Sequence, residues 1–356
     1  MIERYFDNAA TTPIDPRVLR EMQPYMELAF EGFGNANSAH SFGQRAAAAV
    51  ETARHRVATL LGAEDPSQIY FTSGATESNN WVAANFPGGW TSPIEHSSMR
   101  EAACANGFEV LEARGYELMP PPETASLISV MAVNNETGGL LDYSALRAHA
   151  RKLHSDATQA IGKVEFELSK LDYASFSGHK FYGPKGIGGL YSREMDLTPL
   201  LHGGEQEHGM RSGTLNVPGI VGIGAAAAIA TDEMEANRAK AIEMRAAVLE
   251  GLKDAADMLV ISPENSTPFI LMVAFEGVEG AALVLDCDQE GFCVSAGAAC
   301  SAQSTEPSKV LRALNVEARL LRGAVRISFG RFNQLAEAER LGQVLCRSCE
   351  KLRRMV

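Results

Sequence analysis

The amino-acid sequence predicts an α/β fold, in which a large domain with a mainly parallel sheet is joined to a smaller α+β domain. Short apolar runs alternate with segments of helical periodicity along the chain, as in folds whose parallel strands are connected by helices. The chain has 356 residues, more than one average domain. Its 46% hydrophobic content is enough for sizeable cores. We therefore expect two domains.

The first helix with a clear pattern covers residues 44–62, where apolar residues recur at helical spacing and Gly62 supplies a stop. Residues 69–72 have the composition of a strand, and residues 73–80 follow as a turn that enters a helix. The other strands expected in this domain are residues 127–133, 173–176 and 188–191.

A long helical segment over residues 219–256, rich in alanine and then in charge, is expected to lead into the second domain. Beyond it strands and helices are mixed, which indicates an α+β domain. Strands are expected over residues 269–275 and 325–329, and helices over residues 280–285 and 335–354. We place the domain boundary near residue 245.

Composition excludes several classes of protein. The formal net charge of −12 argues against a general nucleic-acid binder and against binding to anionic membranes, because both surfaces repel a net acid. No apolar run is expected to reach membrane-spanning length, since charge or glycine interrupts the longest candidates. Residues 1–7 lack the form of a signal peptide.

The six cysteines do not form the pattern of a disulfide framework in a chain of this length, so we expect a cytoplasmic protein. Cys346 and Cys349 lie on a helical pattern without a second pair of ligands. No metal site is therefore expected.

Lys180 follows an apolar strand and is enclosed by small, turn-forming residues that can hold its amine rigidly in a pocket. Asp156 lies at a second expected strand end, and Gln159 follows three residues later. Lysine and aspartate at neighbouring strand ends suit pyridoxal phosphate, which needs an amine for a Schiff base and an acid for its pyridinium nitrogen. Taken singly, Lys180 has the alternative of a surface charge and Asp156 that of a capping acid.

Residues 71–78 form a second candidate segment, which comes directly after a strand and opens a helix. Its small residues, its helix N-terminal amides and the Thr76 hydroxyl suit an anionic phosphate, although an ordinary glycine turn with a helix cap has the same sequence. His96 follows an apparent strand. An isolated histidine is more often structural, but beside a cofactor ring it can stack and shuttle protons.

Cys300 lies in a loop of very small residues, whereas Cys287 and Cys293 lie in apolar runs. A thiol in such a loop is accessible and can travel, and the alternative is an incidental loop thiol. Arg326 interrupts a strand with a guanidinium group that suits a carboxylate, with a structural salt bridge as the alternative.

Further motifs extend this pattern almost from end to end. They include Asp156-Ala157-Thr158-Gln159, Ser177-Gly178-His179-Lys180 and Met210-Arg211-Ser212-Gly213-Thr214, as well as residues 5–12, 34–35, 38–43, 72–78, 95–96, 134–138, 306–308 and 326–328. In this order the motifs resemble the cysteine desulfurases of the NifS/IscS type, within the class-V, fold-type I pyridoxal phosphate enzymes.

The resemblance implies a fold-type I pyridoxal-phosphate-dependent transferase and roles for the matching positions. Its large cofactor-binding domain would comprise residues 14–245, and its small domain, which carries the catalytic-cysteine loop, residues 1–13 plus 246–356. Lys180 would bind pyridoxal phosphate covalently and move the Cα proton, His96 would stack above the ring, and Cys300 would take the sulfur as a persulfide.

The remaining implied roles concern binding. The ring would be bound by Asp156 at its nitrogen and by Gln159 at its hydroxyl. The phosphate would be held by Ala75, Thr76, Ser177 and His179, with Thr214 reaching across the interface of a homodimer. The substrate carboxylate would be held by Arg326, Asn35 and Asn135.

The implied reaction converts L-cysteine to L-alanine and passes sulfur to an acceptor protein, which would be an iron–sulfur scaffold or a sulfurtransferase. One alternative is a related class-V lyase or aminotransferase, for example one acting on selenocysteine, that uses Lys180 but does not require Cys300. Another is an inactive homologue that serves as a dimeric binding partner, although the presence of the full candidate set argues against it. The chain departs from the family pattern at Glu205 and His208, where a glycine and an arginine are usual, and it ends at Val356 without the longer tail of many relatives.

Overall fold

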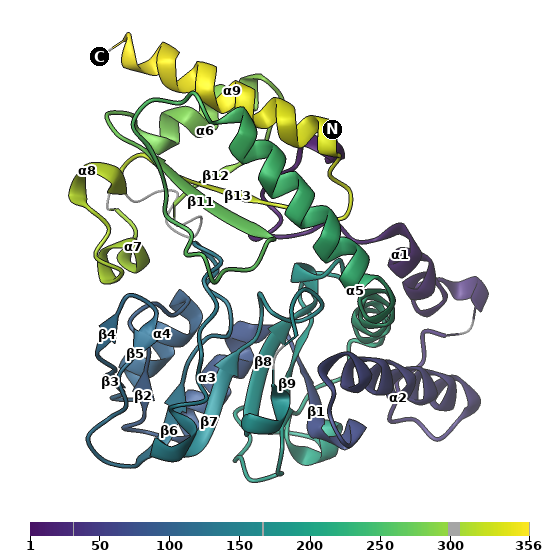
Figure 1. Cartoon of the computed structure of the whole chain (residues 1–356). Coiled ribbons are helices and arrows are strands. Elements are labelled where there is room, and N and C mark those ends of the chain that lie inside the picture. The colour runs from purple at the N-terminus through teal and green to yellow at the C-terminus, as the bar shows by residue number, and fades with distance from the viewer. Residues whose placement is uncertain (31, 166, 298–306, 356) are drawn as a thin grey trace.

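The computed structural model describes residues 1–30, 32–165, 167–297 and 307–355, and its two larger sheets lie in separate halves of the molecule (Figure 1). The first sheet has seven strands in the order β1-β9-β8-β7-β6-β2-β3. They are β1 (Ile69–Thr72), β2 (Trp90–Thr91), β3 (Glu109–Val110), β6 (Ala125–Ser129), β7 (Ala150–Asp156), β8 (Tyr173–Ser177) and β9 (Gly188–Ser192). Pairing is parallel from β8 to β3 and antiparallel on both sides of β9, which confirms the predicted class.

The register of β7 and β8 brings two predicted site segments together. His154 pairs with Tyr173 and Asp156 with Ser175, so the two parallel strands end at the same edge of the sheet. Every residue of β8 is buried, which is typical of a strand covered on both faces. Beyond β8 the chain turns through the short helix η7 (Gly178–Lys180), which places Lys180 near the end of β7.

Helices flank this sheet on both sides (Figure 1). They are α1 (Pro16–Met22), α2 (Ser41–Leu61), α3 (Ala75–Asn85) and α4 (Ser97–Ala105), with the short hairpin β4 (Ala113–Arg114) and β5 (Glu117–Leu118) following α4. The helix α2 confirms the prediction for residues 44–62 but begins earlier, at Ser41. It ends at Gly62, whose φ of 73° is a left-handed conformation that glycine adopts without steric cost.

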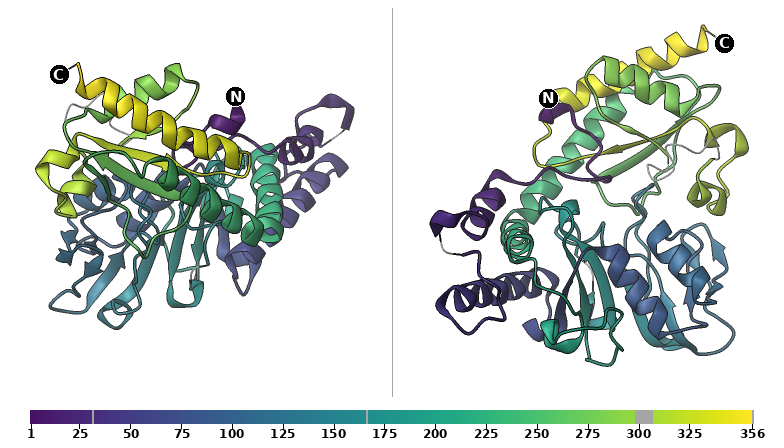
Figure 2. Two further views of the ribbon diagram at one scale, coloured as in Figure 1. Left: turned by 45° about the horizontal axis from the view of Figure 1, so that its top comes forward. Right: turned by 180° about the vertical axis from the view of Figure 1, so that it is seen from behind.

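The second sheet is antiparallel, with the strand order β10-β11-β13-β12. Its strands are β10 (Met258–Val260), β11 (Ile270–Phe275), β12 (Ser295–Ala296) and β13 (Ala324–Ser328), and its helices are α6 (Gly280–Gln289), α7 (Lys309–Ala313), α8 (Ala318–Leu321) and α9 (Leu335–Arg353). Phe6 belongs to the core of this half, where its ring meets that of Phe329 edge-on at 6.0 Å. The start of the chain lies beside α9 (Figure 2), and Arg4 pairs with Glu337 at 2.7 Å.

The helix α5 (Val217–Gly251) connects the two halves, packing against α1 and α2 and also against α9. By length and composition it could cross a membrane, so the expectation that no run reaches that length is wrong. However, 61% of its most apolar window is buried inside the molecule, and the core helix of a soluble protein passes the same test.

One strand is shorter than expected. The apolar run at residues 127–133 predicts a strand up to Val133, but β6 ends at Ser129. Two residues later the amide of Met131 donates to the Glu95 carboxylate at 2.8 Å. The Val130 and Ala132 amides nevertheless donate to the His154 and Asp156 carbonyls of β7, each at 3.0 Å. The apolar run therefore follows β7 beyond the end of the regular strand.

Candidate active site

A cavity of about 670 Å³ lies where the carboxyl ends of β7 and β8 face the second half of the molecule. It is bordered by the N-terminal segment at Ala9 and Ala10, by β13 at Arg326, and by Pro307 to Val310. The predicted site residues that line it are Ala75, Thr76, His96, Asn135, Asp156, Gln159, Ser177, His179, Lys180 and Arg326. Segments far apart in the sequence thus meet at one place.

Three predicted residues are not among those that line the cavity. Asn35 is exposed, and its Oδ1 accepts a hydrogen bond from the Asn37 amide at 3.0 Å. Thr214 is exposed on the segment before α5. Cys300 lies between Gly297 and Pro307, outside the residues that the structure describes.

The amine of Lys180 is positioned by the N-terminal segment. Its Nζ donates to the carbonyl oxygens of Ala9 at 2.7 Å and Ala10 at 2.8 Å. That segment is itself fixed, because the amide of Thr12 donates to the His179 carbonyl at 2.9 Å. The N-terminal segment and η7, which are far apart in the sequence, therefore together set the position of the lysine amine.

Asp156 is 4% exposed and keeps both carboxylate oxygens hydrogen-bonded. Oδ2 accepts from Asn79 Nδ2 at 2.8 Å, and Oδ1 accepts from the Thr158 amide at 3.0 Å. Two residues earlier, His154 lies between Ser129 and Ser175, and burial lowers its pKa to about 4. The imidazole is therefore neutral and adds no positive charge beside Asp156.

His96 caps the N-terminus of α4. Its Nδ1 accepts from the Ser98 amide at 3.2 Å and lies 2.8 Å from Ser98 Oγ. Asn79 Nδ2 donates to the same hydroxyl at 2.9 Å, so Asn79 links Asp156 to His96 through Ser98. With Nδ1 accepting, the proton of the neutral ring is on Nε2. The sequence gives no prediction for Asn79, although this residue directly follows residues 71–78, the segment predicted to bind a phosphate.

The turn into α3 has the form of an anion site. The amide of Ala75 donates to Ser177 Oγ at 2.8 Å. Gly188 is needed here, because a Cβ at this position would lie 2.6 Å from Gly74 Cα. The acid in the first turn, Glu77, pairs with Arg211 at 2.8 Å, which offsets its repulsion of an anion.

His179 borders the same turn. Its Nδ1 lies 3.1 Å from Thr11 Oγ1. Burial, together with the charge of Lys180, lowers the pKa of His179 to about 4. A neutral imidazole can donate a hydrogen bond to a phosphate without being protonated first.

Arg326 is 2% exposed on β13. Its Nη1 donates to the Asn135 carbonyl at 2.8 Å, and its Nη2 donates to Asp7 Oδ1 at 2.9 Å. Within the described residues, Arg326 Nε and Asn135 Oδ1 are buried atoms without a hydrogen-bond partner. Because buried polar atoms are normally satisfied, these two atoms have unused hydrogen-bonding capacity beside the cavity.

Two acids that line the cavity were not predicted. Glu95 Oε1 accepts from Ser92 Oγ at 2.5 Å and from the Met131 amide at 2.8 Å, and burial raises the pKa of Glu95 to about 8. Glu136 accepts from Ser308 Oγ at 2.5 Å, and burial raises its pKa as well. In the sequence both look like ordinary acids, and only packing makes them unusual.

The side chains of the cavity fit pyridoxal phosphate at three points. Lys180 provides the amine, Asp156 a carboxylate held by neutral donors, and the turn from Gly74 to Thr76 an anion site whose backbone approach depends on Gly188. This is the combination that a pyridoxal phosphate site requires.

Comparison with known proteins defines first the class and then the family. The model of the family "Aminotransferase class-V" matches residues 4–104 and 118–341. The chain is 40% identical over 380 residues to a cysteine desulfurase IscS of Methanosarcina thermophila, with 99% of this chain and 93% of the relative covered. The chain therefore belongs to the class-V aminotransferase family, in its cysteine desulfurase branch.

Solved structures agree with this assignment. A NifS-like protein superimposes with a TM-score of 0.85 at 37% identity, covering 98% of this chain and 99% of that one. SspA in complex with cysteine gives a TM-score of 0.78 at 30% identity, covering 93% of this chain and 100% of that one. The resemblance derived from the motifs is confirmed.

Proposed function

We propose that the chain is a pyridoxal-phosphate-dependent cysteine desulfurase, which converts L-cysteine to L-alanine and takes the sulfur as a persulfide on Cys300. The observation that carries this proposal is the convergence of Lys180, Asp156 and His96 on one cavity. When bound, pyridoxal phosphate supplies a ring that accepts electrons from the substrate Cα.

Residues of the chain orient the cofactor, transfer the proton and bind the substrate. Asp156 would pair with the ring nitrogen of the cofactor, and Asn79 holds the orientation of the Asp156 side chain. Lys180 carries a proton to and from the substrate Cα, from a position set by the carbonyl groups of Ala9 and Ala10. Arg326, whose Nε is buried without a hydrogen-bond partner among the described residues, would bind the substrate carboxylate, which a guanidinium group suits.

Cys300 collects the sulfur. Its thiolate forms a bond to the sulfur of cysteine, and the substrate C–S bond breaks. The electron pair of that bond stays on the substrate carbon, where a proton completes L-alanine. One S–S bond replaces one C–S bond, so no external oxidant is required. The persulfide is then available to an acceptor protein, which we propose to be an iron–sulfur scaffold or a sulfurtransferase.

We further propose a homodimer in the cytoplasm, in which Thr214 serves the partner's cavity. Thr214 does not line the cavity of its own chain, and the loop that precedes it is held by polar contacts. Glu207 in that loop binds Arg54 and the Phe71 amide, each at 2.8 Å, and both Glu207 and His208 have left-handed backbones. A loop fixed in this way can present an exposed Thr214 to a second chain. The five described cysteines are free thiols, which suits a reducing compartment.

The test is to incubate the purified protein with L-cysteine and a reductant, and to measure alanine and sulfide. We expect both products from the wild type and neither from Lys180→Ala or Cys300→Ala. No alanine from a wild type that binds pyridoxal phosphate would contradict the desulfurase. Undiminished activity in Cys300→Ala would instead indicate a class-V lyase that transfers no sulfur to the enzyme.

A further inference from the structure

Lys163 is a buried lysine behind the wall of the cavity, on the turn that follows β7. The residue is 7% exposed and is not among those that line the cavity. The backbone turns helically here, because the Ile161 amide donates to Ala157 O at 2.9 Å and the Val164 amide to Ala160 O at 3.0 Å. Residues four apart lie on one side of such a turn. Gln159 and Lys163 are four residues apart.

Gln159 is held between Lys163 and the N-terminal segment. Lys163 Nζ donates to Gln159 Oε1 at 2.9 Å, and Gln159 Nε2 donates to the Ala9 carbonyl at 2.8 Å. The same carbonyl accepts from Lys180 Nζ at 2.7 Å. A carbonyl oxygen only accepts, so the amide nitrogen must face Ala9 and its oxygen must face Lys163. Ala9 and Lys163 therefore together fix one of the two possible orientations of the amide, and Lys163 holds its oxygen.

The surroundings of Lys163 contain no acid to pair with its amine among the described residues. The charged side chains of Lys180, on η7, and Arg326, on β13, lie near Lys163. The charge of Lys163 in turn contributes to the lowered pKa of His179. On its other side is a cavity of about 10 Å³, which Tyr182 and Arg331 also line. A water molecule needs about 10–15 Å³, so at most one can hydrate the amine.

These surroundings disfavour a charged ammonium group. Burial, with the charges of Lys180 and Arg326, lowers the pKa of Lys163 to about 7. Near neutral pH the side chain therefore exists both as a neutral amine and as a cation. Both forms donate to Gln159, but only the cation repels a proton on a neighbouring nitrogen.

We propose that Lys163 is a positioning residue of the cofactor site, which fixes the Gln159 amide toward the cavity and, when protonated, opposes protonation of the Lys180 nitrogen. The proposal rests on the proposed function, in which Gln159 and Lys180 are the groups that touch pyridoxal phosphate. Lys163 touches neither cofactor nor substrate and acts through Gln159 and through its charge. It thereby sets the pH range in which the site changes protonation state.

The test is a pH titration of the absorption spectrum of the protein loaded with pyridoxal phosphate. The midpoint of the spectral transition reports the proton on the Lys180 nitrogen. In Lys163→Met we expect it to rise, on the order of one pH unit, because a neighbouring cation and the restraint on Gln159 are lost. In Lys163→Arg we expect it to fall, because the added charge is permanent.

A matched control is Lys240→Met. Lys240 is also partly buried with a pKa lowered by burial, but its Nζ donates to the Arg331 carbonyl at 2.7 Å and not to Gln159. We expect this variant to titrate like the wild type. Circular dichroism checks that each variant folds, and if Lys163→Arg does not fold, the comparison of Lys163→Met with Lys240→Met decides.

The outcomes separate this proposal from the one on which it rests. A wild type that shows no cofactor absorption band contradicts the proposed function and this proposal with it. A wild-type band, with the same midpoint in Lys163→Met, Lys163→Arg and Lys240→Met, overturns only the role of Lys163. A shift of equal size in Lys163→Met and Lys240→Met also overturns it, because the effect would then not depend on Gln159.

Discussion

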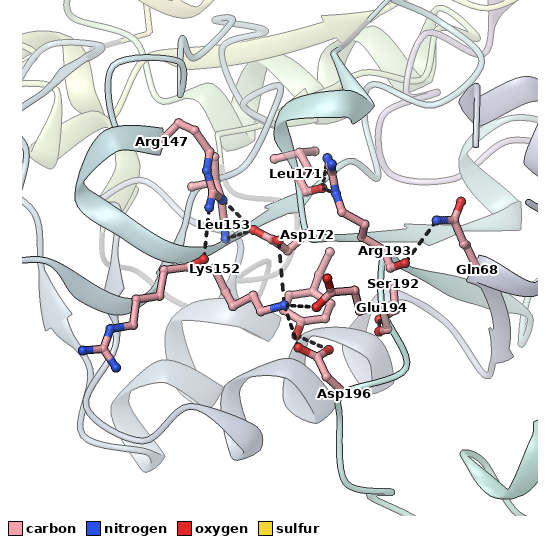
Figure 3. A network of polar contacts seen from close by, with 12 residues as sticks. Gln68, Arg147, Lys152, Leu153, Leu171, Asp172, Ser192, Arg193, Glu194 and Asp196 are labelled. Carbon is pink, nitrogen blue, oxygen red and sulfur yellow. Dashed lines mark hydrogen bonds and ion pairs between the residues drawn. The ribbon is translucent and has the colours of Figure 1, made fainter. Parts of the chain in front are cut away.

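The two ends of β7 and β8 carry charged side chains in very different arrangements. At the amino ends, Lys152 pairs with Glu194 at 2.9 Å and Asp196 at 2.6 Å, and Asp172 accepts from Arg147 at 2.5 Å (Figure 3). Burial alone would lower the pKa of Lys152, but its hydrogen bonds to Asp196 and Glu194 raise it. Each charge in this network has an opposite charge beside it.

At the carboxyl ends, two buried ionisable groups, Lys163 and Glu95, have no ion-pair partner among the residues that the structure describes. Burial lowers the pKa of Lys163 to about 7 and raises that of Glu95 to about 8. Both groups change charge near neutral pH, whereas Lys152 does not. Opposite charges therefore hold the strands together at the amino ends. At the carboxyl ends, burial gives Lys163 and Glu95 the perturbed pKa values that are typical of functional sites.

The largest expected effect is the difference in activity between a variant of Asp156 and a variant of Asp172. We expect Asp156→Asn to lower the rate of alanine formation on the order of 100-fold or more, because the ring nitrogen loses its carboxylate. Asp172→Asn should leave that rate near the wild-type value and instead lower the free energy of unfolding by about 1–3 kcal/mol, since Asp172 accepts from the Leu153 amide at 2.8 Å. Kinetics and denaturant unfolding of both variants check this, and equal losses of activity would remove the distinction.

A second comparison concerns two lysines. The pKa of Lys163 is about 7 in the folded protein against an ordinary value of 10.5, so the unfolded chain binds more protons between these values. Wild-type stability should therefore rise with pH in this window relative to Lys163→Met, on the order of 1–4 kcal/mol. Lys152→Met should instead lose about 0–1 kcal/mol at neutral pH, because its pKa is raised by partners it would no longer have. Urea unfolding at several pH values measures both, and a flat difference for Lys163→Met would contradict the account.

The contribution of Glu95 to stability should change with pH in the opposite direction to that of Lys163. The pKa of Glu95 is about 8 in the folded protein against an ordinary value of 4.5, so the folded protein binds more protons between these values. This contribution to stability is present below pH 4.5 and is lost as pH rises through about 8. Glu95→Gln keeps the size and removes the titration, so its stability relative to the wild type should increase with pH, on the order of 1–2 kcal/mol. Thermal unfolding across this range measures the change, and no trend would show that Glu95 is not held protonated.

The smallest effect should come from salt. Raising the ionic strength to about 1 M shortens the screening length to about 3 Å, which weakens ion pairs near the surface. The cost of Lys152→Met should then shrink, since Lys152 is 20% exposed. The effect of Lys163→Met should persist, because that residue is buried. The same salt response in both variants would mean that the two ends of the strands do not differ.

The sequence predicted much of this arrangement because local patterns determine it. Apolar runs placed β8, β9, β11 and β13 within a residue or so, and the turn-forming residues after β8 indicated where Lys180 stands. The motif matches named ten residues that line the cavity. The family and its cofactor followed from the same motifs.

The missed features depend on contacts between distant segments. Glu95 binds the Met131 amide within the predicted strand, and the orientation of Asp156 depends on Asn79. Lys163 resembles a surface lysine in the sequence, and only the burial of its turn against η7 and β13 gives it a perturbed pKa. Asn35 does not line the cavity, and its position likewise cannot be predicted from the sequence motif alone. It depends on the folded conformation of residues 32–37, in which Asn35 Oδ1 binds the Asn37 amide.

The central claim is that sulfur leaves L-cysteine at the carboxyl ends of β7 and β8 and is received by Cys300. The most direct measurement is mass spectrometry of the peptide that contains Cys300, after the loaded protein has reacted with L-cysteine without reductant. The account predicts that this peptide gains the mass of one sulfur atom while one equivalent of alanine forms, and that Lys180→Ala shows neither. Alanine formation with an unmodified Cys300 peptide, or with the added sulfur on another cysteine, would contradict it.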